Sequence, residues 1–288
     1  MTPTPPGTPR LALLLLLLPA AAAAQEAKPA PPVGEKPTAQ TADQAFLRDQ
    51  AVLLPAGRQT LELSAAYARG VLELGTSRVE GTAAEAQLAW RVGVLDDVQV
   101  AARLPWRYRR VGVFDAGGDA AGTRHALGDL SLGLFAVALR EGAGWPNLIV
   151  SLDGVLPTGP GESGAGGGLA ATRSYDPVIL FCGVSYLHGF APRPGDAGRT
   201  LARHNVGFNA GAAFAMNESV AVTGQLVGTV RNEAAGAGAV RPQREQYRIQ
   251  LGVTLLVTPR LFVEPTVAVA VGTASPDLTL GLSVPWTL

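Results

Sequence analysis

The sequence is poor in cysteine and histidine. Cys182 is the only cysteine among 288 residues, so the chain has no pair for an internal disulfide and no cysteine cluster for a metal ion. Its surroundings, VILFCGVSY, predict a small apolar residue on a strand. The three histidines lack the spacing of a metal-binding motif; His125 and His188 are expected in loops, and His204 near the start of a strand. The sequence therefore predicts neither a metal site nor a cofactor.

Excess charge of one sign and long apolar runs are also missing. Lys plus Arg and Asp plus Glu each number 23, so the chain lacks the basic excess that is typical of a nucleic-acid-binding protein. After residue 24 no apolar run approaches the 18 or so residues of a membrane-spanning helix, although charged residues make up only 16% of the chain. A membrane barrel places its apolar residues at alternate positions, and this composition suits one.

The first 24 residues have the pattern of a secretory signal peptide. Arg10 precedes a run of six leucines, 13–18, and Ala22-Ala23-Ala24 forms a cleavage site before Gln25. Residues 25–58 begin with a stretch rich in Pro, Ala and polar residues and are predicted to form a flexible periplasmic arm, with a short ordered plug as the alternative. Residues 59–288 are predicted to form the folded domain.

The stretch 84–108 alternates between apolar and polar residues on both sides of a turn at Leu95-Asp96-Asp97. It predicts a hairpin of two strands, each about 11 residues long. Strands in soluble proteins usually have about 5–6 residues, whereas a tilted strand that crosses a bilayer needs about 9–11. An outer-membrane hairpin would turn its apolar face to lipid, and a soluble β-sandwich would cover that face with a second sheet.

The same alternation recurs along the chain and predicts about twelve strands, an even number typical of bacterial barrels. The expected strands are 60–68, 84–94, 98–108, 128–139, 147–157, 169–175, 178–187, 204–216, 219–230, 246–257, 261–271 and 278–288. Short turns are expected at 95–97, 140–146, 176–177, 217–218 and 258–260, and longer loops at 69–83, 109–127, 157–168, 188–203, 231–245 and 272–277.

The connections alternate between short and long, which is the arrangement of outer-membrane barrels with short periplasmic turns and longer outer loops. The fold class predicted is therefore all-β, a single antiparallel transmembrane barrel with both termini periplasmic. The glycine-dense stretch 157–168 is expected to be a flexible or lumen-folded loop. Five residues are expected to face lipid: Leu88, Val100, Leu132, Leu251 and Val269.

The last strand also fits an outer-membrane barrel. Leu280, Leu282, Val284, Trp286 and Leu288 alternate, and such a strand is the signal that the barrel-assembly machinery reads, although here the last residue is Leu and not Phe. Aromatic residues near strand ends are expected to form the girdles at the two membrane interfaces. They are Trp90, Trp106, Trp145, Trp286, Tyr67, Tyr108, Tyr186 and Tyr247.

A series of short motifs carries a resemblance to a known family. GDLSLGL, VLPTG before a glycine-rich stretch, YDPVILFCGVSYLHGF, NAGAAFAMNESVAV and ASPDLTLGLSVPWTL follow one another in order. In this order they resemble the transporter-type outer-membrane barrels grouped with the phenol meta-pathway (MetA-like) degradation proteins, over about 128–288 and more weakly over 50–108. The resemblance implies a barrel that passes small or hydrophobic compounds, and it implies no catalytic residues.

Charged residues at positions that alternate with the apolar face are the candidates for the lumen. They are Glu62, Glu85, Arg91, Arg103, Arg107, Asp129, Asp153, Arg248 and Glu264. Charges inside a wall of low dielectric should pair. Such residues either set the selectivity of a narrow pore or close the lumen as a network of ion pairs.

The function predicted is passive passage of small molecules, hydrophobic or aromatic ones included, across an outer membrane. The partners expected are outer-membrane lipid, an unidentified solute and the barrel-assembly machinery. A non-transporting structural or adhesion barrel is the first alternative. An outer-membrane enzyme is the second, but there is no G-x-S-x-G motif, so the chain is expected not to be an enzyme.

Overall fold

The computed structural model describes residues 53–74, 77–115, 118–159, 163–190, 203–233, 244–272 and 277–288. The predicted signal peptide, 1–24, and most of the predicted arm, 25–52, lie outside these residues. None of the described residues belongs to a helix that could cross a membrane.

Thirteen strands form one antiparallel sheet. They are β1 Gln59–Leu74, β2 Ser77–Leu95, β3 Val98–Asp115, β4 Gly118–Leu127, β5 Leu130–Leu139, β6 Asn147–Leu156, β7 Gly164–Tyr175, β8 Val178–Gly189, β9 Arg203–Asn217, β10 Val220–Glu233, β11 Arg244–Thr258, β12 Leu261–Val271 and β13 Leu278–Thr287. Each strand pairs with its neighbour along the chain except that β4 and β5 both pair with β3, and β1 pairs with β13.

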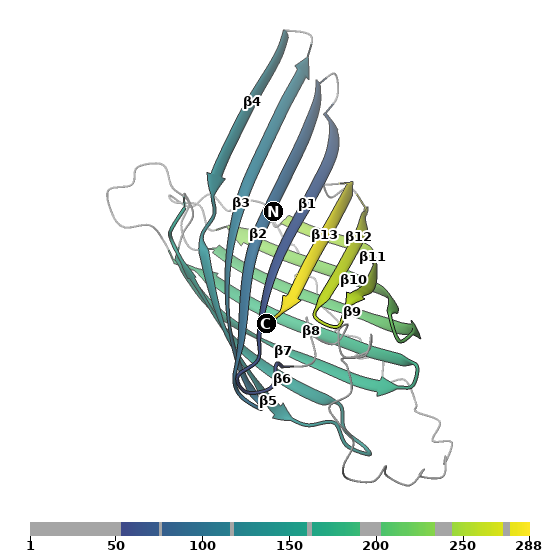
Figure 1. The fold of residues 1–288 in the computed structure, drawn as a ribbon. Coiled ribbons are helices and arrows are strands. Elements are labelled where there is room, and N and C mark those ends of the chain that lie inside the picture. Colours follow the sequence, from purple (N-terminus) through teal and green to yellow (C-terminus); the bar gives the residue numbers. More distant parts are fainter. Residues whose placement is uncertain are drawn as a thin grey trace, which may run out of the picture. The chain divides into compact units, whose positions relative to one another are not determined.

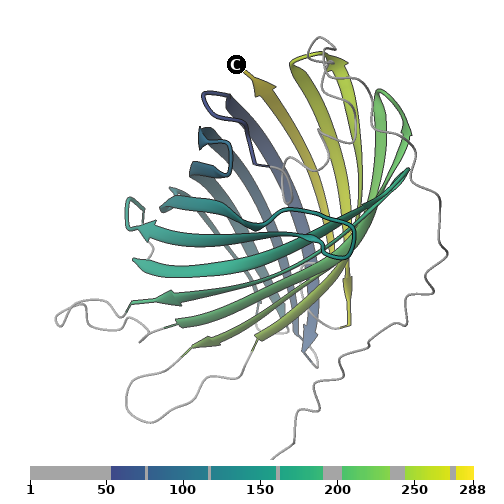
Figure 2. The same ribbon diagram turned by 90° about the horizontal axis from the view of Figure 1, so that it is seen from below.

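The sheet is therefore a closed barrel, which Figures 1 and 2 show in two views related by a turn of 90°. β4 pairs with residues 106–115 of β3 and β5 with residues 98–103, so these two strands share one position in the wall. Thirteen strands thus fill twelve positions, and the twelve-stranded barrel expected from the alternation is confirmed. The five short turns are confirmed as well, four of them with only two residues between the strands.

The expectation of a long loop is wrong at two places in the chain. Residues 69–74, 77–83, 109–115 and 118–127 are strand: β1 and β2 pair through Leu74 and Ser77, and β3 and β4 pair through Asp115 and Gly118. The reason is that the row beyond Tyr67 holds Arg69, Thr82 and Arg110 on the outer face, and the rows after it mix charged residues with apolar ones. The regular apolar alternation that marks a strand in lipid therefore ends although the backbone pairing continues. Figure 1 shows the ends of β1 to β4 rising beyond the end of β13.

The glycine-dense stretch 157–168 was expected to be a loop, but its last part is strand, because β7 begins at Gly164. A Cβ atom on Gly166 would meet the carbonyl oxygen of Tyr186 on β8, and one on Gly167 would lie 2.6 Å from the carbonyl oxygen of Ser151 on β6. These glycines therefore let β7 approach both neighbours closely. The remaining connections, 191–202, 234–243 and 273–276, lie outside the described residues.

The outer face carries the apolar side chains. All five residues expected to face lipid are exposed, from Val100 at 36% to Leu251 at 54%. Aromatic residues gather in rows near the two ends: Trp90 and Trp286 flank Leu61 in register near the short turns, and Tyr67 and Tyr108 flank Ala84 toward the other end. Rows of this kind are the girdles of outer-membrane barrels.

Apolar side chains also fill the lumen near the short turns. We call this set the closing layer: Leu54, Ile149, Ile179, Phe181, Phe262 and Pro285, all buried. Phe262 is completely buried, although the alternation predicts polar residues on the inner face.

Leu54 belongs to residues 53–58, the end of the predicted arm. Its backbone N–H donates to Oε1 of Gln99 at 3.0 Å, and Gly57 and Arg58 exchange backbone hydrogen bonds with Gly93 of β2. A Cβ on Gly93 would meet the carbonyl oxygens of Leu54 and Pro55, so this segment lies directly against β2.

Candidate solute pathway

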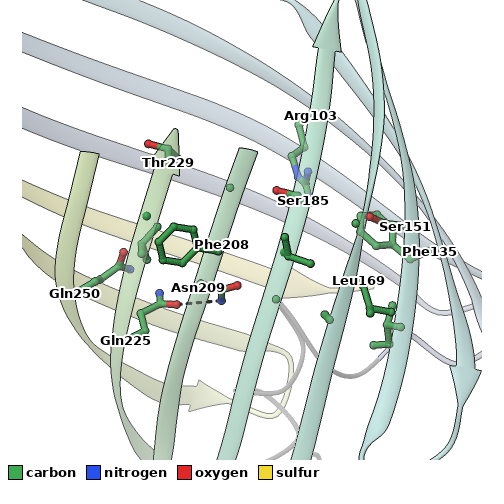
Figure 3. Close-up of a pocket in the computed structure, with 18 of the residues that line it drawn as sticks. Arg103, Phe135, Ser151, Leu169, Ser185, Phe208, Asn209, Gln225, Thr229 and Gln250 are labelled. Carbon is green, nitrogen blue, oxygen red and sulfur yellow. Dashed lines mark hydrogen bonds between the residues drawn. The ribbon is translucent and has the colours of Figure 1, made fainter. Parts of the chain in front are cut away.

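A cavity of about 550 Å³ lies inside the barrel, on the side of the closing layer that faces away from the short turns (Figure 3). Leu53 and Ile149 line it on the side of the short turns. The rest of the wall mixes uncharged polar side chains with apolar ones and glycines, Leu169, Val184, Phe208 and Val227 among the apolar ones. Gln99, Ser151, Ser185, Asn209, Gln225, Thr229 and Gln250 contribute hydroxyl and amide groups. The only charged residues among the described residues that line it are Arg91 and Arg103.

Arg91 is paired and buried. Its Nη2 lies 3.2 Å from Oε2 of Glu62, and the two side chains are 6% and 12% exposed. The hydroxyl of Ser283 donates to the other oxygen of the same carboxylate at 2.7 Å. This cluster joins β2, β1 and β13, and it holds the Arg91 charge in a fixed place near the point where the first and last strands close the barrel.

Arg107 is paired too, but in a more exposed position. Its Nε donates to Oε2 of Glu85 at 2.7 Å, and both side chains are more than 40% exposed. A pair in this environment adds little to stability and leaves almost no net charge. The expectation that charges in the lumen pair with one another is confirmed for Arg91 with Glu62 and for Arg107 with Glu85.

Arg103 forms no ion pair with any of the residues that the structure describes. Its guanidinium carbon lies 5.9 Å from the ring centroid of Phe135 on β5, at the edge of cation–π distance. Both side chains line the cavity. Figure 3 shows Arg103 and Phe135 on the same side of the lumen. The guanidinium is thus a charge without an ion-pair partner among the described residues that a solute in the cavity would meet.

Amide side chains cover the other side of the cavity. Asn209 donates to Oε1 of Gln225 across β9 and β10 at 3.4 Å. Gln250 on β11 lines this cavity and also a second one of about 250 Å³, which Glu85, Gln87, Glu264 and Thr266 line as well. Polar space therefore extends from β3 across the barrel to the inner faces of β1, β2, β12 and β13.

The other lumen candidates do not line the main cavity. Asp129 accepts a hydrogen bond from the backbone of Gly159 at 3.2 Å, and Asp153 accepts one from the hydroxyl of Ser151 at 3.2 Å. Glu264 lines the second cavity, and Arg248 sits beside Val227 and Ala270 in register. The nine candidates therefore form no single cluster.

Sequence reasoning selected charged residues only, and so it missed the glutamines, asparagine and serines that supply most of the polar groups of the cavity wall. The same alternation could have found Gln99 and Gln225, because they share the inner face with Arg103 and Thr223. It could not have found Phe135 or the closing layer, since apolar residues were assigned to the lipid side.

The histidines occupy strands and not loops. His125 lies in β4 and His188 in β8, so the expectation of loops is wrong for both; His204 lies near the start of β9, as expected. His188 and His204 are opposite each other in register, and the hydroxyl of Tyr186 lies 2.7 Å from Nδ1 of His204. Among the described residues no three His, Cys, Asp or Glu side chains are grouped to hold a metal ion.

Cys182 is exposed on β8, between Leu180 and Val184 on the outer face.

An antiparallel wall of twelve strand positions, closed around a polar lumen and apolar outside, is the architecture of bacterial outer-membrane barrels. Comparison with known structures agrees. The COG4313 outer membrane channel from Pseudomonas putida F1 has a TM-score of 0.62 and 11% sequence identity, over 88% of this chain and 100% of that chain. The NanC porin has a TM-score of 0.53 and 8% identity, over 79% of this chain and 100% of that chain. No family model matches the sequence.

Proposed function

We propose that this protein lets small polar molecules cross an outer membrane passively, and that it favours anions. The observation that carries the proposal is Arg103, which faces the main cavity and forms no ion pair with a described residue. None of the described residues that line this cavity is a carboxylate, and Arg91 adds a second positive charge, although Glu62 compensates it. A charged lining in a narrow lumen sets the sign of the ions that enter.

The wall offers hydrogen-bonding groups to a hydrated solute beside apolar side chains. Hydroxyl and amide groups from β3, β6, β8, β9, β10 and β11 line the cavity, and Phe135 lies beside Arg103. Apolar side chains such as Leu169, Val184 and Phe208 line it as well. The likeness to a channel and a porin supports passage through the barrel. The resemblance to the phenol meta-pathway group, which implied hydrophobic compounds, stays a prediction.

Location and assembly belong to the same proposal. The short turns would face the periplasm and the longer strands β1 to β4 the outside, as in other barrels of this kind. The alternating strand β13 would be the segment that the barrel-assembly machinery recognises. The absence of a catalytic motif in the sequence favours a channel over an enzyme.

Ion selectivity in planar bilayers tests the proposal. With a salt gradient across the membrane, the wild-type barrel is expected to show a reversal potential on the anion side. Arg103→Gln should lower the ratio of anion to cation permeability severalfold, because the uncompensated charge in the cavity is lost. The matched control is the double variant Glu85→Gln with Arg107→Gln, which removes an ion pair without changing the net charge. An unchanged reversal potential in Arg103→Gln would remove this residue from the selectivity mechanism.

A barrel that does not conduct is the second candidate, and the closing layer is the observation that favours it. Leu54, Phe262 and Pro285 pack where a pore would have to continue toward the short turns. If purified protein gives no conductance in bilayers and no swelling of liposomes in small sugars or amino acids, the transport function is wrong and a structural role is correct.

A further inference from the structure

A groove lies on the outer face of the barrel, over β13, β1, β2 and β3, with a volume of about 370 Å³. Its floor is made of alanines, because Ala65 is opposite Ala86 and Ala84 is opposite Tyr67 in the register of β1 and β2. Its walls are Tyr67, Trp106, Leu280 and Leu282. Small residues between large ones on the same face produce a depression of this kind.

The groove is closed in one direction and open in the other. Toward the short turns, the next row holds Leu63, Leu88 and Leu104, whose side chains end the depression. Toward the far end, the floor leads past Ala84, between Tyr67 and Tyr108, to Thr82. The groove is therefore mainly apolar and opens where the outer face becomes polar. Glu85 also borders it, but its carboxylate is paired with Arg107.

Two arginines flank that opening. Arg69 and Arg110 are the direct partners of Thr82 on its two neighbouring strands. Because adjacent strands are about 4.8 Å apart, the two Cα atoms are about 10 Å apart with Thr82 between them. We call Arg69, Thr82 and Arg110 the basic row.

The two arginines of the basic row carry positive charge that is available to a ligand. Arg110 is exposed and forms no ion pair with the described residues. Arg69 is 57% exposed and lies 3.8 Å from Glu80, whose carboxylate is held at 2.7 Å by Arg78. Two guanidinium groups beside a hydroxyl suit a phosphate, which accepts strong charge-assisted hydrogen bonds from arginine.

We propose that this surface binds a lipopolysaccharide molecule through its lipid A part, with one acyl chain in the groove and a phosphate on the basic row. β1 and β2 remain paired beyond the basic row through Leu74 and Ser77. That extension gives the sugars of a glycolipid a protein wall, whereas a glycerophospholipid ends near its phosphate. The inference rests on the proposed outer-membrane location with β1 to β4 facing outward.

Native mass spectrometry of the full chain folded in detergent tests the site, with purified lipid A and phosphatidylglycerol as the two probes. Wild type should bind lipid A more tightly than phosphatidylglycerol. The double variant Arg69→Gln with Arg110→Gln should lose about tenfold or more in lipid A affinity, because two charge-assisted hydrogen-bond donors are lost. Ala84→Leu should cause a similar loss by filling the floor.

Two variants outside the site are matched controls. Arg140→Gln removes an arginine at the short turns, and Ala210→Leu adds the same bulk on the exposed face of β9. Both should bind lipid A as wild type does. If Ala84→Leu does not fold, as shown by loss of the heat-modifiable band on gels, the arginine variant still decides.

Equal lipid A binding by wild type and the arginine variant would overturn the proposal. Equal binding of phosphatidylglycerol and lipid A, both lost in the arginine variant, would make the groove a phospholipid site and the glycolipid assignment wrong. Conductance in bilayers free of lipopolysaccharide should be unchanged in all variants, because the groove faces away from the lumen. Failure of the channel function and failure of this inference would therefore be seen in separate measurements.

Discussion

Arg91, Arg103 and Arg107 come from one hairpin and face the same lumen, yet they have different surroundings. Arg91 is buried beside a carboxylate, Arg107 is exposed beside another, and Arg103 lies beside a phenyl ring. The difference comes from the partner strand, because Glu62 on β1 forms an ion pair with Arg91, whereas Arg103 forms none with the described residues. Burial and pairing together decide what each substitution costs.

Removal of the Glu62 side chain should lower the stability of the barrel strongly. In Glu62→Ala the Arg91 guanidinium, only 6% exposed, would lose its counterion inside the wall, with an expected cost of about 3–5 kcal/mol in the free energy of unfolding. Glu85→Ala should cost about 0–1 kcal/mol, since that pair is exposed. Urea unfolding of the barrel in lipid vesicles, followed by tryptophan fluorescence, measures both. Equal costs would mean that the Glu62 side chain is hydrated and not buried.

At the scale of the strand, the alternation assigns each residue to lipid or lumen, and β11 offers the sharpest test. Leu251 is 54% exposed on the outer face, and its neighbour Gln250 lines both cavities. Leu251→Arg should cost about 2–4 kcal/mol near the middle of the bilayer. Gln250→Arg should cost far less, because a lumen position stays hydrated. Unfolding in vesicles measures the difference, and a reversed order would mean that the register of β11 is shifted by one residue.

The alternation predicted the strands well where lipid covers one face, and poorly elsewhere. Beyond Tyr67 the outer face holds first Arg69, Thr82 and Arg110, so the regular apolar alternation that marks a strand is interrupted in β1 to β3. In β7 the glycines were interpreted as a loop, although the close approach of β6 and β8 requires them. Both failures have one cause: the polarity pattern of a single strand does not show where its backbone pairs with a neighbouring strand.

For the candidate site, the sequence predicted which charged residues face inward but not which of them meet. The hydrogen bond from Ser283 to Glu62 joins residues that are 221 positions apart, and only closure of the barrel brings them together. The closing layer could not be predicted either, because Phe262 and Ile179 are apolar residues on the inner face. Their burial depends on the width of the lumen at that end and on Leu54 entering it.

The whole molecule should behave as an all-β protein of the outer membrane. Far-UV circular dichroism of the chain in detergent is expected to show β structure with little helix, because all secondary structure in the described residues is strand. On fractionation of cells, the protein should sediment with outer membranes, and its mature form should begin at Gln25. Recovery of a folded form from the soluble periplasm would contradict both the location and the lipid-facing surface.

β1 and β13 are hydrogen-bonded neighbours, so the first and last residues of the barrel wall, 59 and 288, lie next to each other. The backbone N–H of Leu288 donates to the carbonyl oxygen of Gln59 at 2.9 Å, and Thr60 is opposite Thr287. A short linker from residue 288 to residue 59 would therefore complete a ring of polypeptide, and the ring could be reopened at any two-residue turn, such as 217–218. A circular permutant of this kind would start at β10 and end at β9 while keeping every pairing in the wall, so the order of synthesis can be varied independently of the architecture.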